Sequence, residues 1–256
     1  MTEVPQKVNL KLVIEYDGKN YCGWQRQSSS SKFKTIQQTI EESLQVLFPD
    51  EIIKLYGAGR TDSGVHAYGQ VANFKIQKNS LVKFGKNKFL KSLNGILPND
   101  IAVKSVNIVS ERFHSRYSAK ERVYRYFITS EKKGLNGDRF FHIKTKIDIK
   151  LAKEFCKLLV GIHSFESLCK NKEDRHDFLC NIKYAKIRKL NKNDTLFEIS
   201  SSRFLHSMVR GIVGAMLNIS SGKMSIKDFT SKFKKGDKIK IQYVPANALF
   251  LLKVKY

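Results

Sequence analysis

The order of hydrophobic patterns along the chain constrains its fold more than any other feature. In the first half, segments in which apolar and polar residues alternate, as in strands, are separated by segments of helical periodicity. Thr35 is expected to cap the first helix, and Gln38 would complete a capping box. The expected elements are a strand at 8–16, a helix with the apolar stripe Ile36, Ile40, Leu44 and Leu47, strands at 52–56 and 71–76, a helix at 83–97 and a strand at 101–109. This order is that of a split β-α-β unit.

The second half is expected to vary this arrangement. Its patterns predict a strand at 122–129, a helix at 149–160 ended by Gly161, a hairpin of strands 182–190 and 196–201, helices at 204–219 and 226–233, and a last strand at 249–254. Two related halves, 1–110 and 111–256, around one mainly antiparallel sheet predict an α+β protein with a central cleft.

The charge balance indicates the kind of partner. The 256 residues include 47 Lys and Arg against 23 Asp and Glu, a formal net charge of +24. Such an excess favours binding to a polyanion through counterion release, so nucleic acid is the first candidate. A lysine-rich coding bias accounts for part of the excess, but a ratio of two to one goes beyond what solubility requires. No apolar run approaches the ~20 residues of a membrane span, so we expect no membrane attachment.

One carboxylate stands out in the segment Gly57–Ala67. Asp62 lies in a loop between two expected strands, and the loop glycines permit backbone angles closed to other residues and a close approach by a ligand. Arg60 adds a planar, charged group suited to phosphate. The plainer alternative is that Asp62 only tightens a turn, as Asp beside glycine commonly does.

Two nucleotide-binding motifs do not fit this loop. A P-loop needs Gly-Lys-Ser/Thr after its second glycine, and a dinucleotide fingerprint starting at Gly57 and Gly59 needs a third glycine where Asp62 stands. We therefore predict no nucleotide cofactor.

Four blocks, in chain order, carry a resemblance to a known family. They are Ile14–Gly18 with Tyr21–Gln27, Gly59–Ala67, Phe113–Ala119 with Arg122–Tyr126, and Phe204–Gly214. Together they closely resemble the TruA family of tRNA pseudouridine synthases, from about Leu10 to Tyr256. Two departures, Ser63 where relatives carry Ala or Lys and Ala248 where Gly is usual, concern local geometry. Ser63 would alter loop hydrogen bonding, and Ala248 requires a backbone without positive φ.

The resemblance implies roles for individual residues and two ferredoxin-like halves with a basic active-site cleft. Asp62 would act on the bond between the ribose and the uracil, as a nucleophile or as a stabiliser of positive charge on the sugar. Arg210 would pair with this carboxylate, and Tyr124 would pack against the target base and assist proton removal. Arg60 would contact the backbone beside a nucleotide held outside the helix. Without the resemblance, the plainer interpretation of Arg210 is a solvated helix residue and that of Tyr124 is a residue of the core.

The segment around the early loop offers further candidates for RNA contact. Trp24, Gln25 and Arg26 would stack on bases or bind phosphate, with packing of Trp24 onto the body of the protein as the alternative. His66 is expected to orient the loop by a hydrogen bond rather than to act in catalysis.

The sequence thus predicts a cofactor-free isomerase that forms pseudouridine in the anticodon stem-loop of tRNA, at positions 38, 39 and 40 according to the resemblance, and that acts as a homodimer. Two rivals remain: a non-catalytic RNA-binding protein, and a pseudouridine synthase aimed at another RNA.

The cysteines and the amino terminus complete the prediction. Cys22, Cys156, Cys169 and Cys180 lack paired spacing, so we expect free thiols. Cys169, His176 and Cys180 make only a weak zinc set, and we predict no metal. The first seven residues show no signal-peptide pattern, which favours the cytoplasm.

Overall fold

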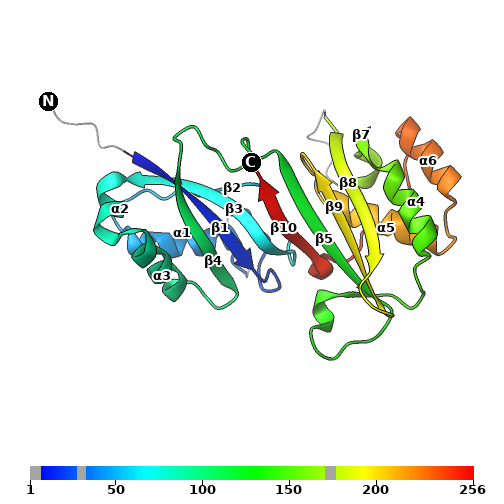
Figure 1. The fold of residues 1–256 in the computed structure, drawn as a ribbon, viewed down its shortest axis with the longest axis horizontal. Coiled ribbons are helices and arrows are strands. Elements are labelled where there is room, and N and C mark those ends of the chain that lie inside the picture. The colour runs from blue at the N-terminus through cyan, green and yellow to red at the C-terminus, as the bar shows by residue number, and fades with distance from the viewer. Residues whose placement is uncertain (1–6, 28–32, 171–176) are drawn as a thin grey trace. The chain divides into compact units, whose positions relative to one another are not determined.

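The computed structural model describes residues 7–27, 33–170 and 177–256 (Figure 1). They divide into two compact units, one made of Met1–Lys120 with Leu252–Tyr256 and the other of Glu121–Leu251. The segment 111–120, which the sequence assigns to the second half, therefore groups with the first unit.

The first unit has the split β-α-β order. Its elements are β1 (Lys7–Tyr16), α1 (Ile36–Leu47), β2 (Tyr56–Gly57), β3 (His66–Gln77), α2 (Lys78–Phe84), α3 (Lys86–Ile96) and β4 (Ile101–Val109). β1 lies between β3 and β4 and is antiparallel to both. Helix α3 packs against β4 and α1 (Figure 1).

Helix α1 begins where the sequence predicts. The Thr35 hydroxyl accepts a hydrogen bond from the Gln38 backbone N–H at 3.2 Å, which satisfies one of the unpaired donors of the first turn. Gln38 does not return the bond of a capping box, because its side chain donates to Glu42 instead. Ile36, Ile40 and Leu44 are fully buried, each contributing about 1.5–3 kcal/mol by leaving water.

Two expectations for the first unit are wrong in part. The run 52–56 forms strand only at Tyr56, because Gln37 and Glu41 of α1, rather than a neighbouring strand, bond the backbone C=O and N–H of Leu55. The expected helix at 83–97 is two helices, which meet at Gly85. Gly85 has φ of 70°, outside the range of helical backbone, so α2 ends there and α3 begins.

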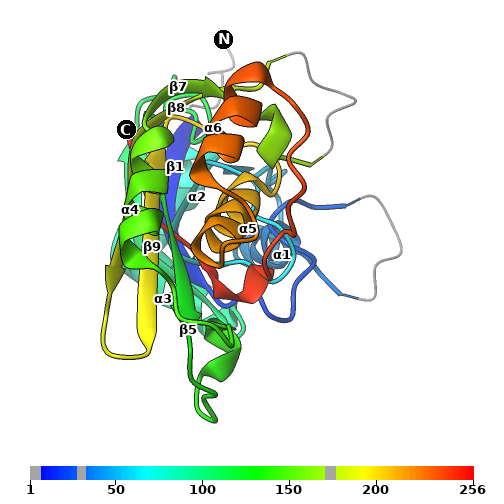
Figure 2. The same cartoon turned by 90° about the vertical axis from the view of Figure 1, so that its right-hand side faces the viewer.

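The second unit contains a four-stranded path in the order β5-β9-β8-β7. Its elements are β5 (Glu121–Thr129), β6 (Phe141–His142), α4 (Ile149–Leu158), β7 (Gly161–Ser164), β8 (Leu179–Lys189), β9 (Asp194–Ser201), α5 (Met208–Ser220) and α6 (Ile226–Lys235). Neighbours along the path are antiparallel, and β6 adds a short parallel pairing to β5. Helix α4 packs against β8, α5 and α6 (Figure 2). The predicted mainly antiparallel α+β fold is confirmed.

Helix α5 starts later than the sequence predicts. Ser207 has φ of 55°, in the left-handed region, so the helix begins at Met208 and not at Phe204. The last strand, β10 (Leu249–Lys255), follows the short helix Ala246–Ala248. Ala248 is not among the residues with positive φ, as its side chain requires.

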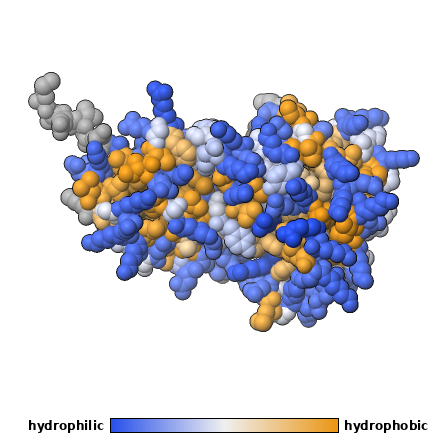
Figure 3. Space-filling view, viewed as in Figure 1, coloured by the Kyte–Doolittle hydropathy of each residue, from blue (hydrophilic) through white to orange (hydrophobic). Residues whose placement is uncertain are grey.

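In the view of Figure 3, hydrophilic residues are spread over both units, with apolar residues between them. Within the described ranges, every helix is too short or too polar to cross a membrane.

Candidate active site

The loop that carries Asp62 is clamped by the segment that follows β1. The backbone N–H of Trp24 donates to the carbonyl of Thr61 at 3.2 Å, and the Ser63 hydroxyl donates to the carbonyl of Tyr21 at 3.0 Å. Both neighbours of Asp62 are therefore tied to the same segment. Asp62 itself is half-buried, and its carbonyl accepts the N–H of Val65 to close the turn.

Two glycines make this close approach possible. A Cβ on Gly18 would collide with the carbonyl oxygen of Val65, and one on Gly23 would lie 2.6 Å from the carbonyl oxygen of Thr61. Gly23 also has φ of 85°, which side chains rarely allow. The early loop needs glycine at these positions to support the Asp62 loop.

A buried group lies beneath the loop. The hydroxyls of Tyr16 and Thr61 are hydrogen-bonded at 2.9 Å, and burial raises the pKa of Tyr16 well above its ordinary value, so its proton stays in place. The Gln70 amide donates to the carbonyl of Gly59 at 3.0 Å, and the N–H of Ala58 donates to Val71. The Asp62 loop is thus fixed from β1 and β3 as well, as a rigid mount for one carboxylate.

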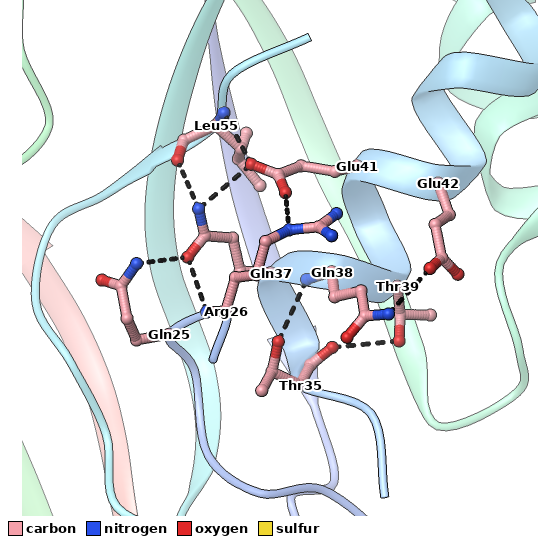
Figure 4. A network of polar contacts seen from close by, with 9 residues as sticks. All are labelled: Gln25, Arg26, Thr35, Gln37, Gln38, Thr39, Glu41, Glu42 and Leu55. Carbon is pink, nitrogen blue, oxygen red and sulfur yellow. Dashed lines mark hydrogen bonds and ion pairs between the residues drawn. The ribbon is translucent and has the colours of Figure 1, made fainter. Parts of the chain in front are cut away.

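Arg60 is exposed and is hydrogen-bonded to a polar network that reaches α1. Figure 4 shows the part of this network formed by Gln25, Gln37 and Glu41. Its Nε donates to the Gln25 side chain at 3.2 Å, and the Gln25 amide donates to Oε1 of Gln37 at 2.9 Å. Gln37 donates to Glu41 and to the Leu55 carbonyl, each at 3.0 Å. The network links an exposed guanidinium to buried side chains of a helix.

Arg26 belongs to the same network. Its Nε lies 2.8 Å from Oε2 of Glu41, and its backbone N–H donates to Gln37 (Figure 4). The Arg26 side chain stays 46% exposed, so its charge faces solvent even in the ion pair. Gln25 and Arg26 are therefore accessible to a ligand.

The suggested RNA contact by Trp24 is wrong. Trp24 is 2% exposed, its ring lies 6.1 Å from that of Tyr16, and a Cβ on Gly57 would collide with the indole. A base cannot stack on an indole ring that is almost fully buried. Trp24 packs the early loop onto the body of the unit.

His66 has the surroundings of an orienting residue. It is 3% exposed, and its Nδ1 lies 3.1 Å from the backbone nitrogen of Gly18 and 2.9 Å from a carboxylate oxygen of Asp17. These contacts join the start of β3 to the end of β1, beside the Asp62 loop.

The second unit holds the other two candidates. Tyr124 lies in β5, is 7% exposed, and meets Phe204 edge to face with ring centroids 5.1 Å apart. Arg210 lies in the first turn of α5, half-buried, and its Nε donates to the Val244 carbonyl at 2.7 Å.

Several supporting residues were not anticipated from the sequence. Tyr16, Gln70, Gln37 and Glu41 are buried polar residues that hold Asp62 or Arg60 in place. The sequence could have indicated Gln37 and Glu41, because they are one helical turn apart and directly beside the apolar stripe of α1, where side chains are buried.

The cysteines carry no disulfide, since all four are free thiols. Among the residues that the structure describes, no cluster of three His, Cys, Asp or Glu could hold a metal ion. His176, part of the weak zinc set, lies outside the described residues.

Comparisons with known proteins identify the family. The family model for tRNA pseudouridine synthase matches residues 12–118 and 155–256. Proteins called tRNA pseudouridine synthase A are 39% identical in Thermodesulfovibrio yellowstonii, over 97% of this chain and 100% of that protein, and 37% identical in Chlorobium phaeobacteroides, over 97% and 93%. A solved H/ACA ribonucleoprotein bound to a substrate RNA is 12% identical with a TM-score of 0.34, covering 80% of this chain and 41% of that one.

The structure presents one carboxylate on a braced loop beside an exposed arginine, and the family match defines the class of the protein as an RNA-modifying enzyme. The chain belongs to the tRNA pseudouridine synthase family, whose model matches residues in both units. It is therefore an isomerase that converts uridine to pseudouridine.

Proposed function

We propose that this enzyme modifies uridines 38, 39 and 40 in the anticodon stem-loop of tRNA, with Asp62 as its catalytic carboxylate. The observation that supports the role of Asp62 is its fixation, since its two neighbours are both bonded to the early loop. The target positions follow the family resemblance. A carboxylate that is held still pays little entropy to reach the reacting carbon. Its oxygen attacks the base or the sugar, or stabilises charge on the sugar while the glycosidic bond breaks.

Arg60 and its neighbours supply RNA binding in this account. The exposed guanidinium binds a phosphate beside the target nucleotide and holds that nucleotide outside the helix. Gln25 and Arg26, which are also exposed, extend the polar surface for the backbone. His66 orients the loop and takes no part in proton transfer.

The second unit provides two further groups in this account. Tyr124 packs against the target base and assists removal of the proton from its C5 carbon. Arg210 pairs with the Asp62 carboxylate in the working enzyme and keeps it charged when the substrate excludes water. Both assignments follow the resemblance of the segments 122–126 and 204–214, and the family model matches the segment of Arg210 but not that of Tyr124.

A homodimer that acts in the cytoplasm, without metal or nucleotide cofactor, completes the proposal. The net charge of +24 supports the RNA partner, because each phosphate neutralised by Lys or Arg releases counterions.

Mapping of pseudouridine tests the target. RNA from cells with and without this protein is compared, position by position, and we expect loss at tRNA positions 38–40 only. Loss at sites in another RNA would support the second rival, and no loss in any RNA would support a binding protein without activity.

A further inference from the structure

A second aromatic surface lies on the first unit, formed by residues that the catalytic account does not use. The rings of Tyr56 and His114 have centroids 5.0 Å apart, and those of His114 and Tyr117 are 4.5 Å apart. Lys54 lies over the Tyr56 ring at 5.5 Å, and Arg116 lies over Tyr117 at 5.6 Å. We call these five residues the aromatic ladder.

The ladder faces solvent. Tyr117 is 76% exposed and Tyr56 is 37% exposed, although both are large aromatic residues. Isolated exposed apolar residues are common, but a run of contacting rings edged by cations is the composition of a surface that stacks nucleic-acid bases.

The loop that carries Tyr117 is held firmly. Ser115 is fully buried, and both its N–H and its hydroxyl donate to Oδ1 of Asn73 at 2.8 Å. The Tyr256 hydroxyl donates to the Ser115 carbonyl at 2.9 Å. Asn73 is also the residue of β3 that pairs with Tyr56 of β2, so one residue fixes both ends of the ladder. The rings are presented before any ligand arrives, which lowers the entropy cost of binding.

His114 is suited to the centre of such a stack. Burial and the nearby Arg116 charge lower the pKa of this histidine below its ordinary value, so the ring is neutral near pH 7. Its Nδ1 accepts the backbone N–H of Arg116 at 3.1 Å. A neutral ring with a fixed tautomer packs between two tyrosines without carrying charge into the stack.

We propose that the aromatic ladder is a second RNA-binding surface, which stacks unpaired bases of the RNA substrate while Lys54 and Arg116 neutralise the adjoining phosphates. RNA is favoured over protein as the partner because exposed aromatic rings adjoin two cations, which suits bases that stack beside phosphates. The proposal rests on the proposed function for the identity of the RNA, but its five residues are not among those that brace the Asp62 loop.

Binding of two RNA probes tests the proposal. The probes are an unmodified tRNA transcript and a fully paired RNA duplex, each titrated against wild type, Tyr117→Ala, Tyr117→Trp and the matched control Ile108→Ala. Ile108 is 62% exposed in β4, outside the ladder. We expect Tyr117→Ala to bind the tRNA about tenfold more weakly. Its duplex affinity and the tRNA affinity of Ile108→Ala should stay unchanged.

Tyr117→Trp adds a direct readout. It should keep tRNA affinity, and its new fluorescence should be quenched by the transcript, because a base stacks on the indole. Native Trp24 is buried and gives a constant background. Unchanged tRNA affinity in Tyr117→Ala, or an equal loss for tRNA and duplex, would overturn the proposal. The proposal would also be overturned if Tyr117→Ala changed only the oligomer mass measured by light scattering, because a second copy of the chain would then cover this face.

The outcome is distinguishable from failure of the proposed function. Wild-type protein that forms no pseudouridine in the transcript would refute the proposed function, whereas the binding assay still decides on the ladder. Normal pseudouridine formation together with unchanged binding by Tyr117→Ala would refute only the ladder.

Discussion

Arg60 donates a hydrogen bond of 3.2 Å from its Nε to the side chain of Gln25, which in turn donates to Gln37 of α1. An exposed arginine normally samples many rotamers. Here it is tied through one exposed amide to a buried one, so its guanidinium is oriented before RNA binds.

This relationship predicts coupling between the two side chains. Gln25→Ala should lower the single-turnover rate on tRNA at subsaturating enzyme by roughly three- to tenfold, because Arg60 loses its orientation. The same change in an Arg60→Ala background should cost less than it does in wild type, because only the direct contact of Gln25 with RNA remains to be lost. Rates of the two single variants and the double variant are the measurement. Fully additive losses would show that Gln25 acts independently of Arg60.

The packing of glycine under the Asp62 loop predicts a sharp contrast between two substitutions. Gly18→Ala places a methyl group against the Val65 carbonyl and should destabilise the protein by about 1–3 kcal/mol, with a lower turnover rate. The control is Gly95→Ala in α3, where a Cβ meets nothing within 4 Å. It should stabilise the protein by about 0.5–1 kcal/mol. Urea unfolding of both variants is the measurement, and equal stabilities would contradict the close approach.

The lowered pKa of His114 predicts a pH dependence of stability. Its unfolded-state value is the ordinary 6.5, so as pH falls through 6.5 the unfolded chain takes up the proton before the folded one does. The folded state therefore loses stability on acidification. Wild type should lose more unfolding free energy between pH 7.5 and pH 5.5 than His114→Gln, which does not titrate. An equal loss in both proteins would show that His114 is not buried in this way.

Most elements of the fold follow from local periodicity, and the exceptions have long-range causes. Strands such as β1 and β4 and helix α4 lie close to their predicted positions because each buries one face over many residues. The run before Tyr56 carries a strand pattern, but its backbone is satisfied by side chains of α1, which no local pattern encodes.

The residues of the site also fall into those that a local motif reveals and those that depend on long-range contacts. Asp62 and Arg60 stand in a contiguous motif and are found directly, whereas Tyr16, Gln37 and Glu41 act through contacts with distant segments. The aromatic ladder joins Tyr56 to the loop at His114 only through the fold. The sequence leaves both RNA contact and packing onto the body open for Trp24, and the distant Gly57, which lets the ring be buried, decides for packing.

The most direct measurement of the central claim is the single-turnover rate of Asp62→Asn on unmodified tRNA. Asn has nearly the same shape as Asp but neither its charge nor a useful nucleophile. The variant should fold and bind tRNA like wild type and form no detectable pseudouridine. Retention of even a tenth of the wild-type rate, a loss of only ~1.4 kcal/mol in transition-state stabilisation, would contradict catalysis by this carboxylate and leave Asp62 a role in the turn.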